Sequence, residues 1–273
     1  MKLATLFIYS ALGRKLSPSF AAYVGEMVAE ALAYAHAAKD SQGNELHVIH
    51  RAVGPMRIRL GFDGRVKLVN FGAAYSELRG RMQTPPDTLR GDVAYTAPEV
   101  WRAVRGSPGP RFDPLISGMI DGRVDVFSLG LVLLEVLLAE YPLDPAAAPV
   151  TKSTAPLIAA VKTELPTWID PGILAERLMR FKVDDVEQRL ESVPRLLRDI
   201  VRRSLAFDPD ERPSARDVRD ELRAYLGTLS IPYGAEEMAR ELKGLRSAAE
   251  NTERFLANTI ERTALASSSE EED

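Results

Sequence analysis

The sequence contains no cysteine, and only three of its 273 residues are histidines. The absence of cysteine excludes disulfide bonds, thiolate metal ligands and a cysteine nucleophile. His36, His47 and His50 show no spacing typical of a metal site, so we expect neither a bound metal nor a resident cofactor. A chain without disulfides fits a reducing compartment, and we therefore expect a cytoplasmic protein.

Long apolar runs are also lacking. The longest run, residues 126–139, contains Ser128 and Glu135 and is shorter than the roughly 20 residues that a membrane-spanning helix needs. We interpret it as a buried helix and expect no membrane association. Arg14 and Lys15 follow the apolar start of the chain, where a secretory cleavage site would need small residues, so export is not expected.

Runs of basic residues are absent as well. The formal net charge is -4, and without clustered lysine and arginine we expect no nucleic-acid binding. A hydrophobic content of 45% and a charged content of 27% are typical of a globular protein. The length accommodates one large domain with an extension.

The spacing of apolar residues predicts a mainly α-helical fold. Ser17-Pro18 is typical of a helix start, and residues 20–36 place their apolar side chains on one helical face. Residues 124–138 are apolar on nearly every side, which predicts a helix at the centre of the domain. Further helices are expected at residues 97–104, 154–163, 171–181, 193–206 and 214–226.

Short strands are predicted at residues 48–49, 58–60 and 66–69. Asp63-Gly64 is the kind of dipeptide that forms a tight turn, so the second and third strands should make a hairpin. These strands lie within the central domain, for which we predict residues 17–226, after an apolar N-terminal segment at residues 1–16.

The C-terminal part of the chain has a different pattern. Residues 227–264 should contain an amphipathic helix, which packs on this domain or serves as a helix for a partner, and the pattern favours neither. The tail at residues 265–273 is rich in serine and acidic residues and should be disordered.

Five short motifs carry the clearest functional signal. They are His50-Arg51-Ala52-Val53-Gly54-Pro55-Met56-Arg57, Asn70-Phe71-Gly72, the stretch from Gly91 to Glu99, the stretch from Asp125 to Gly130, and Leu205 to Pro213. In this order and spacing the chain resembles the C-terminal lobe of the serine/threonine protein kinase family. The sequence Ala33-Tyr34-Ala35-His36 followed by His50-Arg51 is most similar to the bacterial branch of that family. The resemblance implies a mainly helical, C-lobe-like domain with small β-hairpins, no N-terminal lobe, and an extra C-terminal helix.

The resemblance also implies structural roles for a set of retained residues. Glu99 should form a buried ion pair with Arg212, and Asp125 should bind backbone N–H groups of the loop that begins at His50. The full set is His50, Arg51, Phe71, Gly72, Ala97, Pro98, Glu99, Asp125, Gly130 and Arg212.

Several positions depart from what phosphoryl transfer needs in the family. Ala52 stands in place of the aspartate that handles the substrate hydroxyl, and Arg57 and Asn70 stand at the two metal positions. Gly54 replaces a lysine, and Asp92 replaces a small hydroxyl residue. Arg57 is either a solvated side chain or a cation that fills the metal position or pairs with Asp92. Because such groups act as a unit, we predict that the chain is not an enzyme and binds no nucleotide.

These features lead to the hypothesis of an inactive pseudokinase that serves as a protein-binding scaffold or regulator. The family's small lobe carries a glycine-rich loop and a strand lysine that have no counterpart here, so apolar residues at the top of the large lobe should meet a partner protein or a second copy. These residues are Leu3, Leu6, Phe7, Ile8 and Tyr9. The alternative is an atypical or split serine/threonine kinase that uses ATP with a small lobe supplied by a partner.

Overall fold

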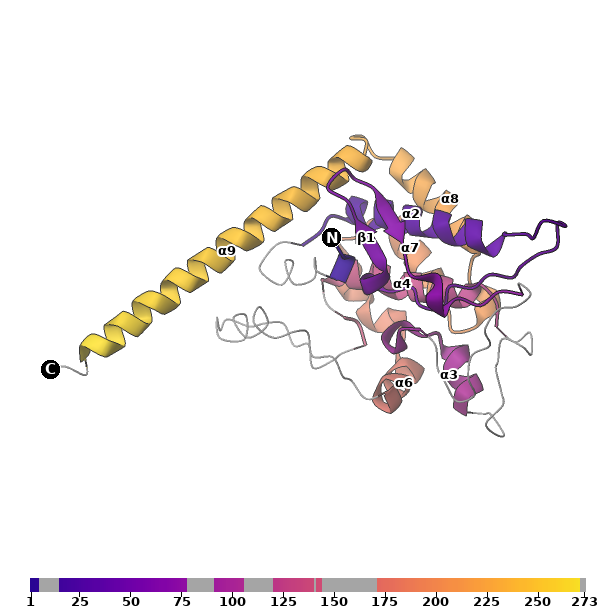
Figure 1. Cartoon of the computed structure of the whole chain (residues 1–273), viewed down its shortest axis with the longest axis horizontal. Helices are drawn as coiled ribbons and strands as arrows, with labels where there is room; N and C mark the ends of the chain where they lie inside the picture. The colour runs from indigo at the N-terminus through magenta and orange to yellow at the C-terminus, as the bar shows by residue number, and fades with distance from the viewer. Residues whose placement is uncertain (5–14, 78–90, 106–119, 140, 144–170, 271–273) are drawn as a thin grey trace.

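The computed structural model describes residues 1–4, 15–77, 91–105, 120–139, 141–143 and 171–270, and Figure 1 shows their arrangement. The α-helices are α2 (Pro18–His36), α3 (Pro98–Arg105), α4 (Arg123–Leu138), α6 (Pro171–Arg180), α7 (Arg195–Ser204), α8 (Ala215–Gly227) and α9 (Ala235–Glu270). The short 3-10 helices are η1 (Pro55–Arg57), η2 (Phe71–Ala73), η3 (Val93–Tyr95), η4 (Val183–Leu190) and η5 (Pro209–Glu211). Strands β1 (Ile58–Leu60) and β2 (Val66–Leu68) form one antiparallel hairpin. The predicted mainly helical class is confirmed.

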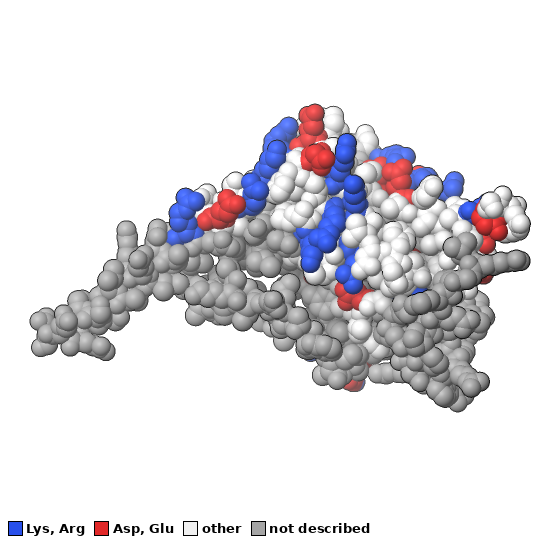
Figure 2. All heavy atoms as spheres, in the orientation of Figure 1, with Lys and Arg blue, Asp and Glu red and all other residues white. Residues whose placement is uncertain are grey.

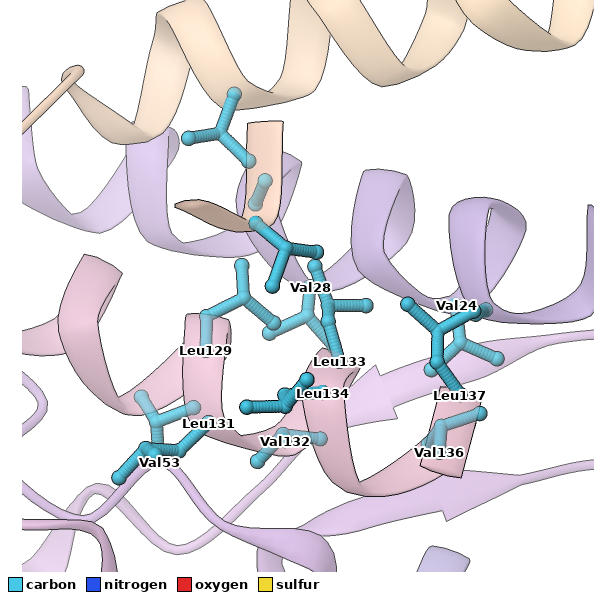
Figure 3. Close-up of a cluster of buried hydrophobic side chains, with 14 of the residues drawn as sticks. Val24, Val28, Val53, Leu129, Leu131, Val132, Leu133, Leu134, Val136 and Leu137 are labelled. Atoms are coloured by element: carbon cyan, nitrogen blue, oxygen red, sulfur yellow. The ribbon is translucent and has the colours of Figure 1, made fainter. Parts of the chain in front are cut away.

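Helix α4 forms the centre of the domain. All of its residues from Val124 to Leu138 are buried, as expected for a helix that is apolar on every side. Its leucines and valines pack against Val24 and Val28 of α2 on one side and Val53 on another (Figure 3). Burial of each such side chain stabilises the fold by about 1.5–3 kcal/mol, so this helix fixes the elements around it.

The start of helix α2 and its packing against α4 follow from particular residues. The Ser17 side chain accepts a hydrogen bond from the Phe20 N–H at 3.0 Å, and Pro18 lacks the N–H that would otherwise be unsatisfied at this position. Gly25 faces α4 so closely that an added Cβ would lie 2.8 Å from Cδ2 of Leu133. The missing side chain therefore lets the two helices approach each other.

The hairpin follows the predicted turn. Gly64 adopts a φ of 82°, which favours glycine, and β1 pairs with β2 so that Arg59 lies opposite Lys67. The strand predicted at residues 48–49 is reduced to a single pair, between Ile49 and Tyr75. A run of two residues has too few backbone hydrogen bonds to form a regular strand.

The first half of α9 packs on its own domain. Met238, Leu242 and Leu245 are buried, and the Glu241 carboxylate accepts hydrogen bonds from the Ser17 backbone N–H at 2.7 Å and hydroxyl at 2.8 Å. For this half, the choice between intramolecular packing and a partner is therefore decided in favour of the former. The second half extends away from the body (Figure 1).

Two predictions about the ends of the chain need correction. Residues 265–270, expected to be disordered, continue α9, because extending an existing helix adds a hydrogen bond for every residue that is fixed. Leu3, expected at an exposed surface, is fully buried. The backbone next to it pairs with β1, because the Leu60 N–H donates a hydrogen bond to the Met1 carbonyl at 2.7 Å. Residues 6–9 and 154–163 lie outside the described part of the chain. Within that part, no helix is both long and apolar enough to cross a membrane.

Candidate functional site

Asp125 holds the loop between α2 and β1 in place. Its two carboxylate oxygens accept hydrogen bonds from the backbone N–H groups of His50 and Arg51, each at 2.8 Å. The ring Nε2 of His36 lies 2.9 Å from the same carboxylate. Asp125 has no exposed surface, so these contacts replace the water that a buried charge would lose.

His50 links the loop to the Asn70-Phe71-Gly72 segment. Its ring meets the Phe71 ring edge-on with centroids 4.6 Å apart. Nδ1 accepts from the Ala52 N–H at 3.3 Å, so Nε2 carries the proton that it donates to the Val69 carbonyl, also at 3.3 Å. Burial lowers the pKa of His50, with opposing attraction from Asp125, and this favours the neutral ring.

Gly91 brings the segment that leads to α3 against the loop. It has a φ of 120°, and an added Cβ would lie 2.0 Å from the Arg51 carbonyl oxygen. Arg51 has a left-handed backbone with a φ of 62°, and its Nε donates to the Ala73 carbonyl at 2.7 Å. Arg51 thus ties the loop to the end of η2, and only glycine fits at position 91.

The two positions that the resemblance assigns to metal ligands flank the hairpin. Arg57 ends η1 directly before β1, and its buried Nε has no hydrogen-bond partner. Asn70 follows β2 with an exposed side chain and a left-handed backbone at φ 68°. A guanidinium repels a divalent cation and a neutral amide is a weak ligand for one, so these residues do not fit magnesium. In the described residues no three His, Asp or Glu side chains gather as a metal site.

Asp92 places a carboxylate beside the same loop. Its Oδ1 accepts from the Ala94 N–H at 3.2 Å, and a Cβ added at Gly54 would lie 3.2 Å from its Oδ2. Burial raises the pKa of Asp92, and attraction to Arg57 partly offsets this, although the two side chains form no ion pair. Ala52, at the position of the family's aspartate, is buried. A carboxylate therefore lies beside this loop at position 92, whereas position 52 has none.

Beneath Asp92, η3 rests on a buried acid of α4. The Tyr95 hydroxyl donates to Glu135 Oε2 at 2.5 Å, and burial raises the pKa of Glu135 to about 8. Burial and Glu135 also raise the pKa of Tyr95. Both side chains are thus neutral at pH 7 and joined by a hydrogen bond. Tyr141 covers Tyr95, with ring centroids 5.7 Å apart.

Glu99 and Arg212 form the ion pair that fixes α3. Two hydrogen bonds of 2.6 and 2.8 Å join them, and the Arg212 side chain is fully buried. The guanidinium also lies over the Phe127 ring of α4, 4.8 Å from its centroid. Ala97, directly before this helix, and Pro98, its first residue, are buried.

The remaining retained glycines differ in their surroundings. A Cβ added at Gly130 in α4 would lie 3.0 Å from atoms of Ser204 and Leu205, so the residue allows α7 to pack closely. Gly72 is exposed, and its added Cβ would lie 3.1 Å from the Asn70 side-chain oxygen.

Two residues of the site were missed by sequence reasoning. Glu135 is the single acidic residue within an otherwise apolar stretch of α4, and that isolation was a usable signal for a buried polar contact. The contact of His36 was also missed, because nothing in its neighbourhood along the chain points to Asp125, which lies in a different helix.

Comparison with known proteins agrees with this architecture. The sequence model for the protein kinase domain matches residues 4–222. The tyrosine-protein kinase MasK of Myxococcus xanthus is 28% identical over 235 residues, which are 85% of this chain and 30% of that protein. The serine/threonine-protein kinase PrkC of Bacillus subtilis is 27% identical over 140 residues, 51% of this chain and 18% of that protein.

A further relative is also a protein kinase, and a solved structure shares the fold. An Aurora kinase of Schizosaccharomyces pombe is 27% identical over 72% of this chain and 40% of its own length. The chain thus spans less than half the length of these three relatives. One chain in the structure of the CAK complex from Chaetomium thermophilum bound to ATP-gamma-S aligns with this chain with a TM-score of 0.54 and 22% sequence identity. The alignment covers 86% of this chain and 67% of that chain, so the two share a fold.

These matches correct one prediction. The expectation that the chain is not an enzyme is wrong, because the domain match and the kinase relatives point to a protein kinase. The substitutions at positions 52, 57 and 70 had suggested inactivity only on the assumption that no other residue takes over their roles. The chain belongs to the protein kinase domain family.

Proposed function

We propose that this chain is an atypical protein serine/threonine kinase in which Asp92 acts as the catalytic base. The position of the Asp92 carboxylate carries the proposal, because its Oδ2 faces Gly54 in the loop that also holds Ala52. The other carboxylate beside this loop, Asp125, has both oxygens engaged by backbone N–H groups. Asp92 is thus placed to receive a proton from a substrate, whereas Asp125 is not.

The chemistry proposed for Asp92 is general-base catalysis of phosphoryl transfer. A substrate hydroxyl gives its proton to the Asp92 carboxylate, and its oxygen forms a bond to the γ-phosphorus of ATP. The bond from that phosphorus to the bridging oxygen breaks, and ADP leaves with the electron pair. A raised pKa strengthens Asp92 as a base, since a base acts best when its pKa approaches the working pH.

Arg57 supplies positive charge next to this carboxylate. Its charge is close enough to lower the pKa of Asp92, and its Nε has no partner among the described residues. An arginine in such a position stabilises the charge that develops on a transferring phosphoryl group. No step of the proposal depends on a divalent metal.

We also propose that a second protein element covers the upper face of the lobe, supplied by a partner or by another copy. Met56 is 40% exposed and Phe71 is 43% exposed, although both flank the site. Two apolar side chains open to solvent beside the reacting groups favour a surface that is covered when the kinase works. Such a cover would exclude water from the site.

A transfer assay tests the role of Asp92. The purified chain is incubated with γ-labelled ATP and a serine/threonine peptide library, once with magnesium and once with EDTA. We expect transfer from the wild type, a loss of at least about a hundredfold in Asp92→Asn, and no loss in Asp184→Asn, whose carboxylate lies on η4. A wild-type chain without transfer under either condition, or an Asp92→Asn variant with full activity, refutes the proposal.

The covering element has its own test. Sedimentation and binding of a hydrophobic dye are compared for the wild type and a Met56→Gln, Phe71→Gln double variant. Self-association or dye binding that disappears in the variant supports an exposed docking face. A wild type that is monomeric at micromolar concentration and binds no dye argues against it.

A further inference from the structure

Three basic side chains form a row across neighbouring strands. Lys2 pairs with Arg59, and Arg59 pairs in turn with Lys67 of β2. Residues that pair directly across antiparallel strands project from the same face of a sheet. Because the flanking Ile58 and Leu60 are buried, the face that carries Arg59 is the outer one. With strands about 4.8 Å apart, the row spans roughly 10 Å.

This row, Lys2–Arg59–Lys67, carries charge that nothing in the described residues neutralises. None of the three side chains takes part in an ion pair there, whereas Arg65 at the turn is paired with Asp63. Figure 2 shows lysine and arginine side chains gathered over the hairpin in the middle of this face. Like charges that face each other across strands are destabilising, so the row costs the fold stability. The chain as a whole has a net charge of -4, so this local excess of positive charge contrasts with the rest of the protein.

The row continues into the candidate site. Arg57 precedes β1 by one residue, and Asn70 follows β2 after Val69. The buried, unpartnered Nε of Arg57 is therefore at the end of the same hairpin that carries Arg59. Where a metal-dependent site would need carboxylates, this surface provides cations.

We propose that Arg57 and the Lys2–Arg59–Lys67 row bind the polyphosphate chain of a nucleoside triphosphate without a divalent metal. This inference rests on the proposed kinase function and adds to it how the nucleotide is held. Lysine and arginine bind phosphate through charge-assisted hydrogen bonds, and a triphosphate has enough negative charge to offset the repulsion within the row. In the usual arrangement a metal ion neutralises the phosphates, and here the protein's own cations would do so.

Binding measurements on the full chain test this inference. ATP, inorganic tripolyphosphate and adenosine are titrated by calorimetry in EDTA, and ATP is titrated again with magnesium. We expect ATP and tripolyphosphate to bind in EDTA, adenosine not to bind, and magnesium to weaken ATP binding, because the metal neutralises the charge that the row recognises. Binding should also weaken with added salt, since the row is exposed.

A pair of matched double variants identifies the residues involved. Arg59→Gln with Lys67→Gln should weaken ATP binding in EDTA at least tenfold, while Lys39→Gln with Lys182→Gln, which removes two exposed lysines elsewhere, should leave it unchanged. The row variant should also have an equal or higher melting temperature, because the repulsion between Arg59 and Lys67 is gone. This second readout separates lost binding from lost folding.

Several outcomes would overturn the inference. These are ATP binding that requires magnesium, equal binding by the row variant and the wild type, and no binding of either ATP or tripolyphosphate in EDTA. Tighter binding of an acidic peptide than of ATP would instead assign the row to a protein partner. Binding is measured without turnover, so transfer that fails while metal-free binding persists refutes only the kinase proposal. Transfer that depends on magnesium and survives loss of the row refutes only the inference.

Discussion

Replacing Glu135 by glutamine should stabilise the protein at neutral pH. Glu135 is buried in α4, and burial raises its pKa from 4.5 to about 8. The hydrogen bond from the Tyr95 hydroxyl lowers this pKa, and repulsion from Asp92 adds to the increase. Between these two values the native carboxyl holds a proton that the unfolded chain has released. The contribution of this proton to the free energy of unfolding is therefore fully present below pH 4.5 and is lost as the pH rises toward 8.

The size of the effect follows from proton linkage. Each pH unit in this window lowers the free energy of unfolding by about 1.4 kcal/mol, which amounts to about 3 kcal/mol at pH 7. Glutamine keeps the shape and can still accept the Tyr95 hydrogen bond, but it does not ionise in the unfolded state. We expect Glu135→Gln to match the wild type near pH 4.5 and to be about 3 kcal/mol more stable at pH 7.

Urea unfolding followed by circular dichroism at pH 5, 6, 7 and 8 measures this difference. Glu26→Gln is the matched control, because Glu26 is also buried but pairs with Arg223 at 2.7 Å, and its loss should destabilise the protein. A difference between Glu135→Gln and the wild type that does not change with pH would show that the buried acid is already ionised in the native protein, which contradicts the reasoning.

The remaining predictions concern folding. Glu99→Gln leaves the buried Arg212 guanidinium without its counter-ion, so urea titration should show a loss of about 3–5 kcal/mol, and a loss below about 1 kcal/mol would mean that water reaches the pair. Gly91→Ala drives a methyl group against the Arg51 carbonyl at an unfavourable φ, so its melting temperature should fall by several degrees. Gly227→Ala is its control, because an added Cβ there meets nothing within 4 Å, and an equal melting temperature for the two variants would exclude the close approach at Gly91.

Local sequence patterns predicted most of the fold. The apolar period of residues 20–36 and the uniformly apolar 124–138 segment correspond to α2 and α4, because each pattern has one way to bury its side chains. Residues 171–181, 193–206 and 214–226 correspond to α6, α7 and α8. The hairpin expected at Asp63-Gly64 is present, and the Gly61 N–H donates to the Arg65 carbonyl across a loop of residues 62–64.

The candidate site was predictable in its positions and less so in its chemistry. The motifs indicated which residues lie near the loop. Comparing each motif position separately with the residue that the family has there led to the wrong conclusion that the chain is not an enzyme. The row of Lys2, Arg59 and Lys67 was not predicted. A two-residue turn at Asp63-Gly64 would set Arg59 opposite Leu68, whereas the strands pair so that Arg59 lies opposite Lys67. Lys2 joins them through a pairing between distant parts of the chain, which no local pattern encodes.

The sequence by itself determined the helical class, the hairpin and the membership of the kinase family, because short-range periodicity, turn residues and motif spacing are properties of neighbouring residues. Only the tertiary structure decided that Asp92 faces Gly54, that Glu135 keeps its proton beside Tyr95, and that three cations line up across strands. Burial, pKa and the sum of nearby charges depend on groups far apart in the chain, and the fold alone brings those groups together.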